Sequence, residues 1–194
     1  ADFPSYGENI AMYVSEVAFW THRALWQLLF SGKFDKFPGL KYCVVECGSW
    51  WVGDLLWKAD VNFGASWKIK KMSSRMKGLL TKLPSEYFGD SVFIGASTMS
   101  RYEIRERHRN GIDALMWGTD YPHPEGSWPN TVHRLENDFQ DVSIEDTRRL
   151  LGLNAIECYN LDVEGLTTVA NRIGPTPEKL NQDPALRTLS LIHI

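Results

Sequence analysis

Apolar residues recur every three or four positions between residues 9 and 31, which predicts a long amphipathic helix ended by Gly32. Three short continuous apolar runs follow, at 41–48, 91–97 and 113–118. Each run is too short for a helix and is bounded by turn residues, so each predicts a buried strand. Continuous apolar strands are typical of parallel sheets whose two faces are both covered.

Helical patterns separate and follow these three runs. Ser100 and Ser143 are candidate N-caps, and Asp146 stands three residues after Ser143 as in a capping box. The predicted helical segments are a tryptophan-rich stretch at 50–57, a lysine-rich stretch at 68–77, and the stretches 101–110, 128–139 and 144–152. After Gly165 the chain is polar and proline-containing, which predicts a surface tail or short helices. Alternation of strands with helices predicts an α/β fold.

The composition is that of a soluble globular protein, with 43% hydrophobic and 23% charged residues. No apolar stretch approaches the roughly 20 residues of a membrane span, and no signal peptide is evident, so we expect a cytoplasmic protein. The net charge of -3 gives no general attraction to nucleic acid or to anionic membranes. Cys43, Cys47 and Cys158 lack a CxxC spacing and are expected to be reduced.

The segment that follows the third run, GTDYPHPEG, holds the strongest candidates for chemistry. Asp120 lies just past the predicted strand, where parallel-sheet enzymes place catalytic carboxylates, and it could hold a metal ion or accept a proton. The alternative is an aspartate that caps the turn before Pro122. His123 and Glu125 share the loop and could bind substrate or orient a metal ligand. Their alternative is an ordinary solvated loop.

Two further candidates lie earlier in the chain. Glu46 ends an apolar strand and would be costly to bury alone, so we expect either a functional role or an ion pair with an arginine. His22 lies on the first predicted helix, close to Trp20 and Trp26, where a surface position and a role at the site both remain open. The histidines at 108 and 133 and the lysine-rich segment are expected to face solvent, although that segment could also attract a phosphate-bearing partner.

Four stretches together resemble the amidohydrolase-related family, which includes aminocarboxymuconate semialdehyde decarboxylase and related metal-dependent hydrolases. They are FWTHRALWQLLFSGKFDKFPGLKYCVVECGSWWV, PSEYFGDSVFIGAS, GIDALMWGTDYPHPEGSWPNT and LLGLNAIECYNLD. The resemblance runs from about Tyr13 to Ile173, and GTDYPHPEG is its most specific part. It implies a (β/α)8 TIM barrel with one divalent metal, usually zinc, at the carboxyl ends of the strands.

Under this resemblance the three runs are strands six, seven and eight. Asp120 matches the aspartate of strand eight, which in the family binds the metal or its water and acts as general base. Glu46 stands where many relatives have an acid/base histidine, which is a departure from the decarboxylase pattern. The remaining family ligands, an HxH or ExH pair and a strand-five histidine, are absent from these residues. A complete barrel needs about 250 residues, so we expect a C-terminal fragment that is inactive alone.

We therefore expect residues 1–164 to form the barrel portion and 165–188 a tail. Residues 189–194 (LSLIHI) resemble a translated sequencing adaptor, the alternative being a natural apolar C-terminus. The expected function is metal-dependent hydrolysis of a C–N or C–O bond in a small-molecule substrate. The alternatives are non-oxidative decarboxylation of an aromatic or unsaturated acid, and a non-catalytic barrel scaffold. Neither nucleic acid nor membrane is an expected partner, and the complete protein is open to homo-oligomerisation.

Overall fold

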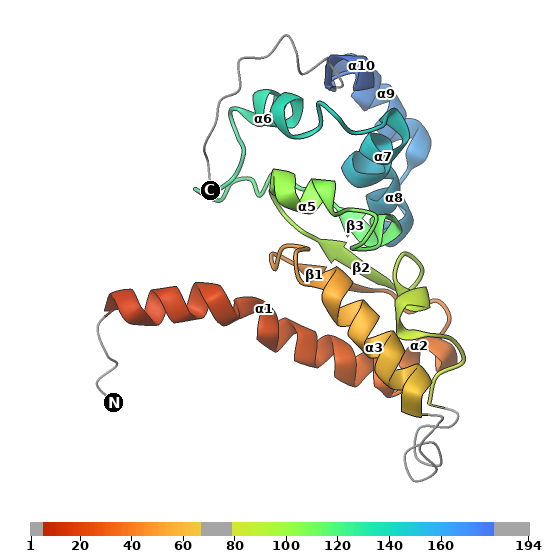
Figure 1. The fold of residues 1–194 in the computed structure, drawn as a ribbon. Coiled ribbons are helices and arrows are strands. Elements are labelled where there is room, and N and C mark those ends of the chain that lie inside the picture. Colours follow the sequence, from red (N-terminus) through yellow and green to blue (C-terminus); the bar gives the residue numbers. More distant parts are fainter. Residues whose placement is uncertain (1–5, 67–78, 181–194) are drawn as a thin grey trace.

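Three parallel strands form the sheet of the computed structural model, which describes residues 6–66 and 79–180. The strands lie in the order β1 (Tyr42–Val45), β2 (Val92–Gly95) and β3 (Leu115–Met116) (Figure 1). Their parallel pairing confirms the α/β prediction. Each strand is shorter than the apolar run that predicted it. The outer residues of each run instead form the turns that enter and leave the sheet, where the backbone departs from extended geometry.

Helices connect the strands and follow them. In chain order they are α1 (Tyr6–Phe30), α2 (Lys33–Lys36), α3 (Val52–Ser66), the 3-10 turn η1 (Pro84–Tyr87), α5 (Arg101–Arg105), the 3-10 turn η2 (Ile112–Ala114), α6 (Thr131–Asp138), α7 (Ile144–Arg148), the π-helical turn η3 (Arg149–Leu153), α8 (Asn154–Tyr159), α9 (Val163–Ile173) and α10 (Pro177–Leu180). The first predicted helix is confirmed as α1. The helix predicted over 68–77 lies outside the described residues.

The helix predicted over 101–110 is wrong in its length, because α5 ends at Arg105 and turns follow. Only Glu103 and Ile104 of α5 are buried, so no apolar face continues to hold the later residues in a helix. Ser100 does cap α5, and its hydroxyl accepts a hydrogen bond from the Glu103 N–H. Ser143 likewise caps α7 by accepting from the Asp146 N–H at 3.1 Å. Both predicted N-caps are therefore confirmed.

The strand register divides the sheet into two faces. Val44, Ile94 and Leu115 are paired across the three strands and lie in the main hydrophobic core, together with residues of α1 and α3. Cys43 and Phe93 are paired on the opposite face. There they pack with Met116 and with α8, which contributes Ala155 and Cys158. The second face is thus covered by α8.

Coverage of this second face is uneven along the strands. Near the amino end of β1, the Lys41 ammonium donates a hydrogen bond to the Glu157 carbonyl of α8 at 2.6 Å, which places the end of α8 there. At the carboxyl end, Val45 is 52% exposed beside Gly95. The face therefore opens toward the strand carboxyl ends. In the described part of the chain, no helix has both the length and the apolar character that a bilayer crossing needs.

Candidate functional site

An unusual backbone conformation marks the carboxyl end of all three strands. Glu46, Ser97 and Asp120 have positive φ angles of 61°, 48° and 59°. Side chains other than glycine rarely adopt this conformation, and each such residue costs roughly 1–3 kcal/mol. Strained residues of this kind concentrate at functional sites. Their coincidence at one edge of the sheet identifies this edge as the candidate site.

Hydrogen bonds of the sheet continue as far as two of these residues, Glu46 and Ser97. The Glu46 N–H donates to the Gly95 carbonyl at 3.0 Å, and the Gly118 N–H donates to the Ser97 carbonyl at 2.9 Å. These bonds extend the pairing beyond the named strands and bring the three strand ends side by side. Ser97, between the other two, ends the predicted run 91–97, but the sequence predicts neither its conformation nor a functional role for it. Serine gives no signal for positive φ, unlike glycine or asparagine.

Asp120 begins a loop that is closed by its own backbone. The Asp120 carbonyl accepts a hydrogen bond from the His123 N–H at 2.8 Å, and the Thr119 carbonyl accepts one from the Ser127 N–H at 2.9 Å. The Gly126 N–H donates to the His123 carbonyl at 2.9 Å. A Cβ at position 126 would lie 2.9 Å from three of these carbonyl oxygens, those of residues 119, 120 and 123. The loop therefore has its tight form only with glycine at this position.

His123 is the side chain that the loop brings to Asp120. His123 Nδ1 lies 3.4 Å from Asp120 Oδ2, and it also lies 3.5 Å from the Glu125 N–H. The first contact is attractive when Nδ1 carries a proton, and the second requires Nδ1 to accept, so the two contacts are alternatives. The Asp120 side chain is 22% exposed and that of His123 is 58% exposed. The imidazole can therefore donate to the carboxylate or release it while facing solvent.

The two predicted glutamates, Glu46 and Glu125, do not contact Asp120 through a hydrogen bond or ion pair among the described residues. Glu46 and Glu125 are both exposed. In the described part of the chain Glu46 forms no ion pair, so the arginine partner considered from the sequence is not found there. No hydrogen bond or ion pair joins Glu46 to Asp120 among the described residues. The two carboxylates share the same edge of the sheet but act as separate groups.

His22 lies against the loop that follows β1. Its ring stacks on Trp51 with centroids 3.8 Å apart, and its Nε2 is buried with no hydrogen-bond partner among the described residues. The Trp51 indole N–H donates to the carbonyls of Cys47 and Gly48 at 3.0 and 3.1 Å. The His22 ring is therefore half-buried beside the loop that follows β1. Burial lowers the pKa of His22 from 6.5 to about 4, so the ring is neutral near neutral pH.

This shift predicts a specific pH dependence of stability. In the unfolded chain His22 takes up a proton near pH 6.5, whereas in the folded protein it does so only near pH 4. Stability contributed by the neutral ring is therefore complete above pH 6.5 and is lost as the pH falls toward about 4. His22→Phe keeps the ring stack but removes the titration. We expect its urea midpoint to fall less than that of the wild type between about pH 7 and about pH 4.

His133, which is exposed on α6, supplies the matched control for this experiment. His133→Gln is expected to keep the pH dependence of the wild type. Equal slopes for the wild type and His22→Phe would contradict the burial of a neutral His22. His108 is also exposed and contacts Asp146 at 3.0 Å, so the prediction that both histidines face solvent is confirmed.

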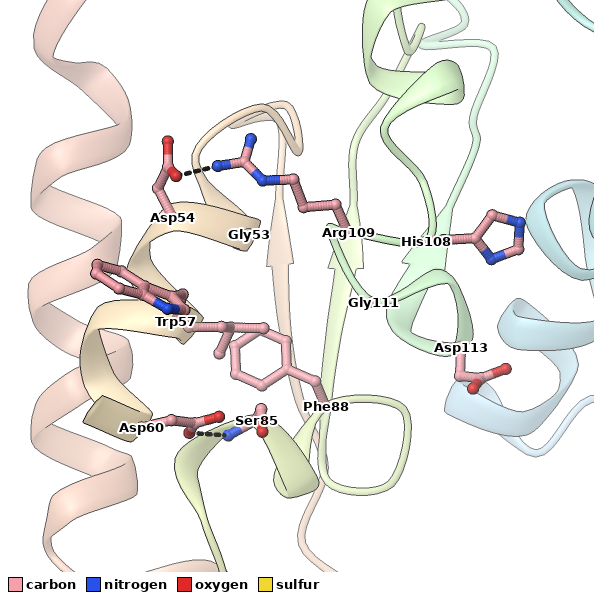
Figure 2. Close-up of a pocket in the computed structure, with 11 residues that line it drawn as sticks. Gly53, Asp54, Trp57, Asp60, Ser85, Phe88, His108, Arg109, Gly111 and Asp113 are labelled. Atoms are coloured by element: carbon pink, nitrogen blue, oxygen red, sulfur yellow. Dashed lines mark hydrogen bonds and ion pairs between the residues drawn. The ribbon is translucent and has the colours of Figure 1, made fainter. Parts of the chain in front are cut away.

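A groove of about 660 Å³ lies elsewhere, along α3 (Figure 2). Trp57 and Phe88 both line it, and the Arg109 guanidinium reaches Asp54 at one end. Phe88 precedes β2 and Gly111, which also lines the groove, precedes β3. Gly53 and Asp54, in the first turn of α3 after β1, line the end where Arg109 lies, so the groove extends along α3 from the side of the strand carboxyl ends to that of the amino ends. None of Glu46, Ser97 and Asp120 lines the groove, so the groove and the candidate site are distinct.

A family model described as amidohydrolase matches residues 17–161. Among solved structures, 5-carboxyvanillate decarboxylase LigW from Sphingomonas paucimobilis is 23% identical with a TM-score of 0.58, over 75% of this chain and 41% of that chain. Amidohydrolase map2389c from Mycobacterium avium subsp. paratuberculosis K-10 is 23% identical with a TM-score of 0.50, over 68% of this chain and 31% of that chain. At this identity the structures share the fold, and this chain spans less than half the length of either. No curated protein matches the sequence.

Proposed function

Since the chain belongs to the amidohydrolase family, we propose that it forms the last three βα units of a metal-dependent (β/α)8 enzyme. In this proposal β1, β2 and β3 are strands six, seven and eight of the barrel. The complete enzyme hydrolyses a C–N or C–O bond, as in an amide, an ester or a lactone. The substrate is a small molecule that enters at the carboxyl ends of the strands.

The geometry of Asp120 is the observation that carries this proposal. Asp120 lies four residues after the end of β3, its backbone has a φ of 59°, and its loop is fixed by backbone hydrogen bonds. A carboxylate held in this way is available to a ligand without rearrangement of the chain, which is the preorganisation that catalysis needs. A turn-capping role alone does not require the contact with His123 or the two further strained strand ends.

This chain supplies one side chain, Asp120, that is suited to bind a divalent metal ion. We propose that the metal is zinc. The Asp120 carboxylate is half-buried and is a suitable oxygen ligand. Within the described residues no three His, Cys, Asp or Glu side chains come together as a metal site. The other ligands would then come from the earlier strands of the barrel. When bound, a divalent metal lowers the pKa of a water molecule toward neutrality and polarises a substrate oxygen.

The residues of this chain have distinct parts in the proposed reaction. Asp120 accepts the proton of the attacking water, and His123 donates to the Asp120 carboxylate or releases it as the charge changes. Glu46, exposed at the end of β1, transfers a proton to or from the substrate. Tyr121 and Trp128 form an exposed edge-to-face pair 5.7 Å apart next to the loop and offer an apolar surface to the substrate.

Decarboxylation is the second candidate, because a solved structure with this fold is a decarboxylase. It would act on an aromatic or unsaturated acid, which the exposed aromatic pair could also contact. We favour hydrolysis because a glutamate, Glu46, stands where the family resemblance expects a histidine. Near neutral pH an ordinary imidazole is available both as a proton donor and as an acceptor, whereas an ordinary carboxyl group is ionised and mainly accepts.

The oxygen of the product distinguishes the two reactions. The complete enzyme is to be assayed in isotopically labelled water against panels of lactones, esters, amides and aromatic acids. Hydrolysis is expected to place labelled oxygen in the product, with activity lost on chelation and restored by zinc. Release of carbon dioxide, with no labelled oxygen in the organic product, would establish the decarboxylase instead. Absence of the upstream histidine ligands from the complete reading frame, together with no turnover, would favour the non-catalytic scaffold.

A further inference from the structure

A buried carboxylate joins two of the loops that form the candidate site. Glu103, on α5, is only 7% exposed. Its Oε1 accepts hydrogen bonds from the Ser49 N–H at 2.5 Å and from the Ser49 hydroxyl at 3.1 Å. Its Oε2 accepts from the Ser100 N–H at 2.8 Å and from the Ser100 hydroxyl at 2.9 Å. Both oxygens are thus fully used, as a buried carboxylate requires.

The two serines belong to different strand ends. Ser49 lies three residues after Glu46, in the loop that follows β1. Ser100 lies three residues after Ser97, in the loop that follows β2. Glu103 therefore links the loop that carries one strained residue to the loop that carries the next. This link crosses between segments that are 54 positions apart in the chain.

Helix capping explains only half of this arrangement. The bonds from Ser100 complete a capping box, in which the glutamate reaches back to the N-cap residue of its own helix. A capping box leaves the second carboxylate oxygen free. Here that oxygen contacts Ser49, which is completely buried. At the neighbouring Gly48, with φ of 59°, a Cβ would lie 3.0 Å from the same oxygen. The loop is thus packed directly against the carboxylate.

We propose that Glu103 is a positioning residue for Glu46. By holding Ser49, it fixes the loop after β1 in the conformation that keeps the Glu46 carboxylate at the rim of the site. Among the described residues, the hydrogen bond from the Glu46 N–H to the Gly95 carbonyl is the one bond that anchors Glu46, and its side chain is exposed. The catalytic consequence of this positioning rests on the proposed function. The structural link between the loops does not.

Glu103→Gln tests the link directly. The amide keeps the shape of the side chain but is neutral and has one acceptor oxygen, so both serine N–H groups lose a bond to a charged acceptor and one of them faces an NH2 group. Hydrogen exchange of the Ser49 amide in the full chain is expected to accelerate about tenfold or more, as expected when a buried hydrogen bond to a charged group is lost. Glu86→Gln is the matched control. Glu86 also accepts a bond from its N-cap residue, Leu83, but it is exposed and precedes β2.

Turnover of the complete enzyme supplies the second measurement. Glu103→Gln is expected to lower kcat about tenfold while the metal content stays unchanged, because Asp120 lies on a loop that Glu103 does not contact. Loss of metal together with kcat would indicate general unfolding and would overturn the proposal, as would unchanged kcat with faster Ser49 exchange. Unchanged Ser49 exchange would overturn it as well. Should Glu103→Gln fail to fold, Ser49→Ala removes a single bond and is expected to show a smaller loss of kcat in the same direction.

An inactive wild-type enzyme would refute the proposed function and not the loop link. In that case the exchange rate of the Ser49 amide still decides whether Glu103 holds the loop. The two proposals therefore fail on different measurements.

Discussion

Replacing Asp120 by asparagine is expected to lower kcat/KM of the complete enzyme by about 10²–10⁴-fold, the contribution of a positioned acid or base. Asparagine has the size of aspartate but is neutral, so it cannot accept the proton of the attacking water. It also tolerates the left-handed backbone better than most residues, so the φ of 59° is retained. The fold should therefore survive the change, and the loss of kcat/KM reports on chemistry.

Asp113 provides the control for this experiment. It lies at the other end of β3, is exposed, and pairs with Arg149 at 2.8 Å. Asp113→Asn is expected to leave kcat/KM unchanged and to alter stability by at most about 0.5 kcal/mol, as is usual for exposed positions. Wild-type kcat/KM in Asp120→Asn would mean that the strand-end carboxylate is not part of the reaction, and the proposed function would have to be abandoned.

Phe93→Ala is expected to cause the largest loss of stability among simple core truncations at the sheet, about 3–5 kcal/mol. The Phe93 side chain is completely buried between the sheet and α8, and the Lys41 ammonium lies 5.1 Å from its ring centroid. Alanine would leave a cavity on the face that carries Cys43 and Met116. Urea denaturation followed by tryptophan fluorescence measures the free energy of unfolding.

Phe37→Ala is a closely matched comparison. Phe37 also has a lysine over its ring, Lys36 at 5.5 Å, but it is 50% exposed. Its truncation is expected to cost at most about 1 kcal/mol, the value of an exposed cation–π contact. Burial is then the main difference between the two sites. Similar losses for both variants would show that α8 does not form a cooperative core with the sheet.

The sequence pattern predicted the parallel sheet and α1 because both depend on apolar spacing that is visible locally. Leu25 and Leu29 are completely buried, as the helical spacing requires. The end of α5 was not predicted, because the charged residues after Arg105 favour a helix by propensity but bury no apolar face. Local pattern thus identified elements whose stability comes from their own buried side chains.

The details of the site depend on partners that are distant in the sequence. The position of Asp120 after a strand was predictable, but its contact with His123 depends on how the loop closes. Burial of His22 depends on Trp51, and the role of Glu103 depends on Ser49. The capping pattern from Ser100 to Glu103 is visible in the sequence, yet it gives no sign of the second oxygen's partner. Such pairings arise only once the strands are aligned.

Gly126 has a consequence for the engineering of new substrate preferences. The loop encloses position 126 with its own carbonyl groups, whereas the side chains of Tyr121, His123 and Glu125 are exposed. A combinatorial library could therefore randomise Tyr121 and Glu125 to alter what the rim contacts, without displacing the carboxylate beside them. Randomising position 126 would fill such a library with distorted loops. Gly126 has to be kept for the loop to close, whereas Tyr121 and Glu125 can be replaced.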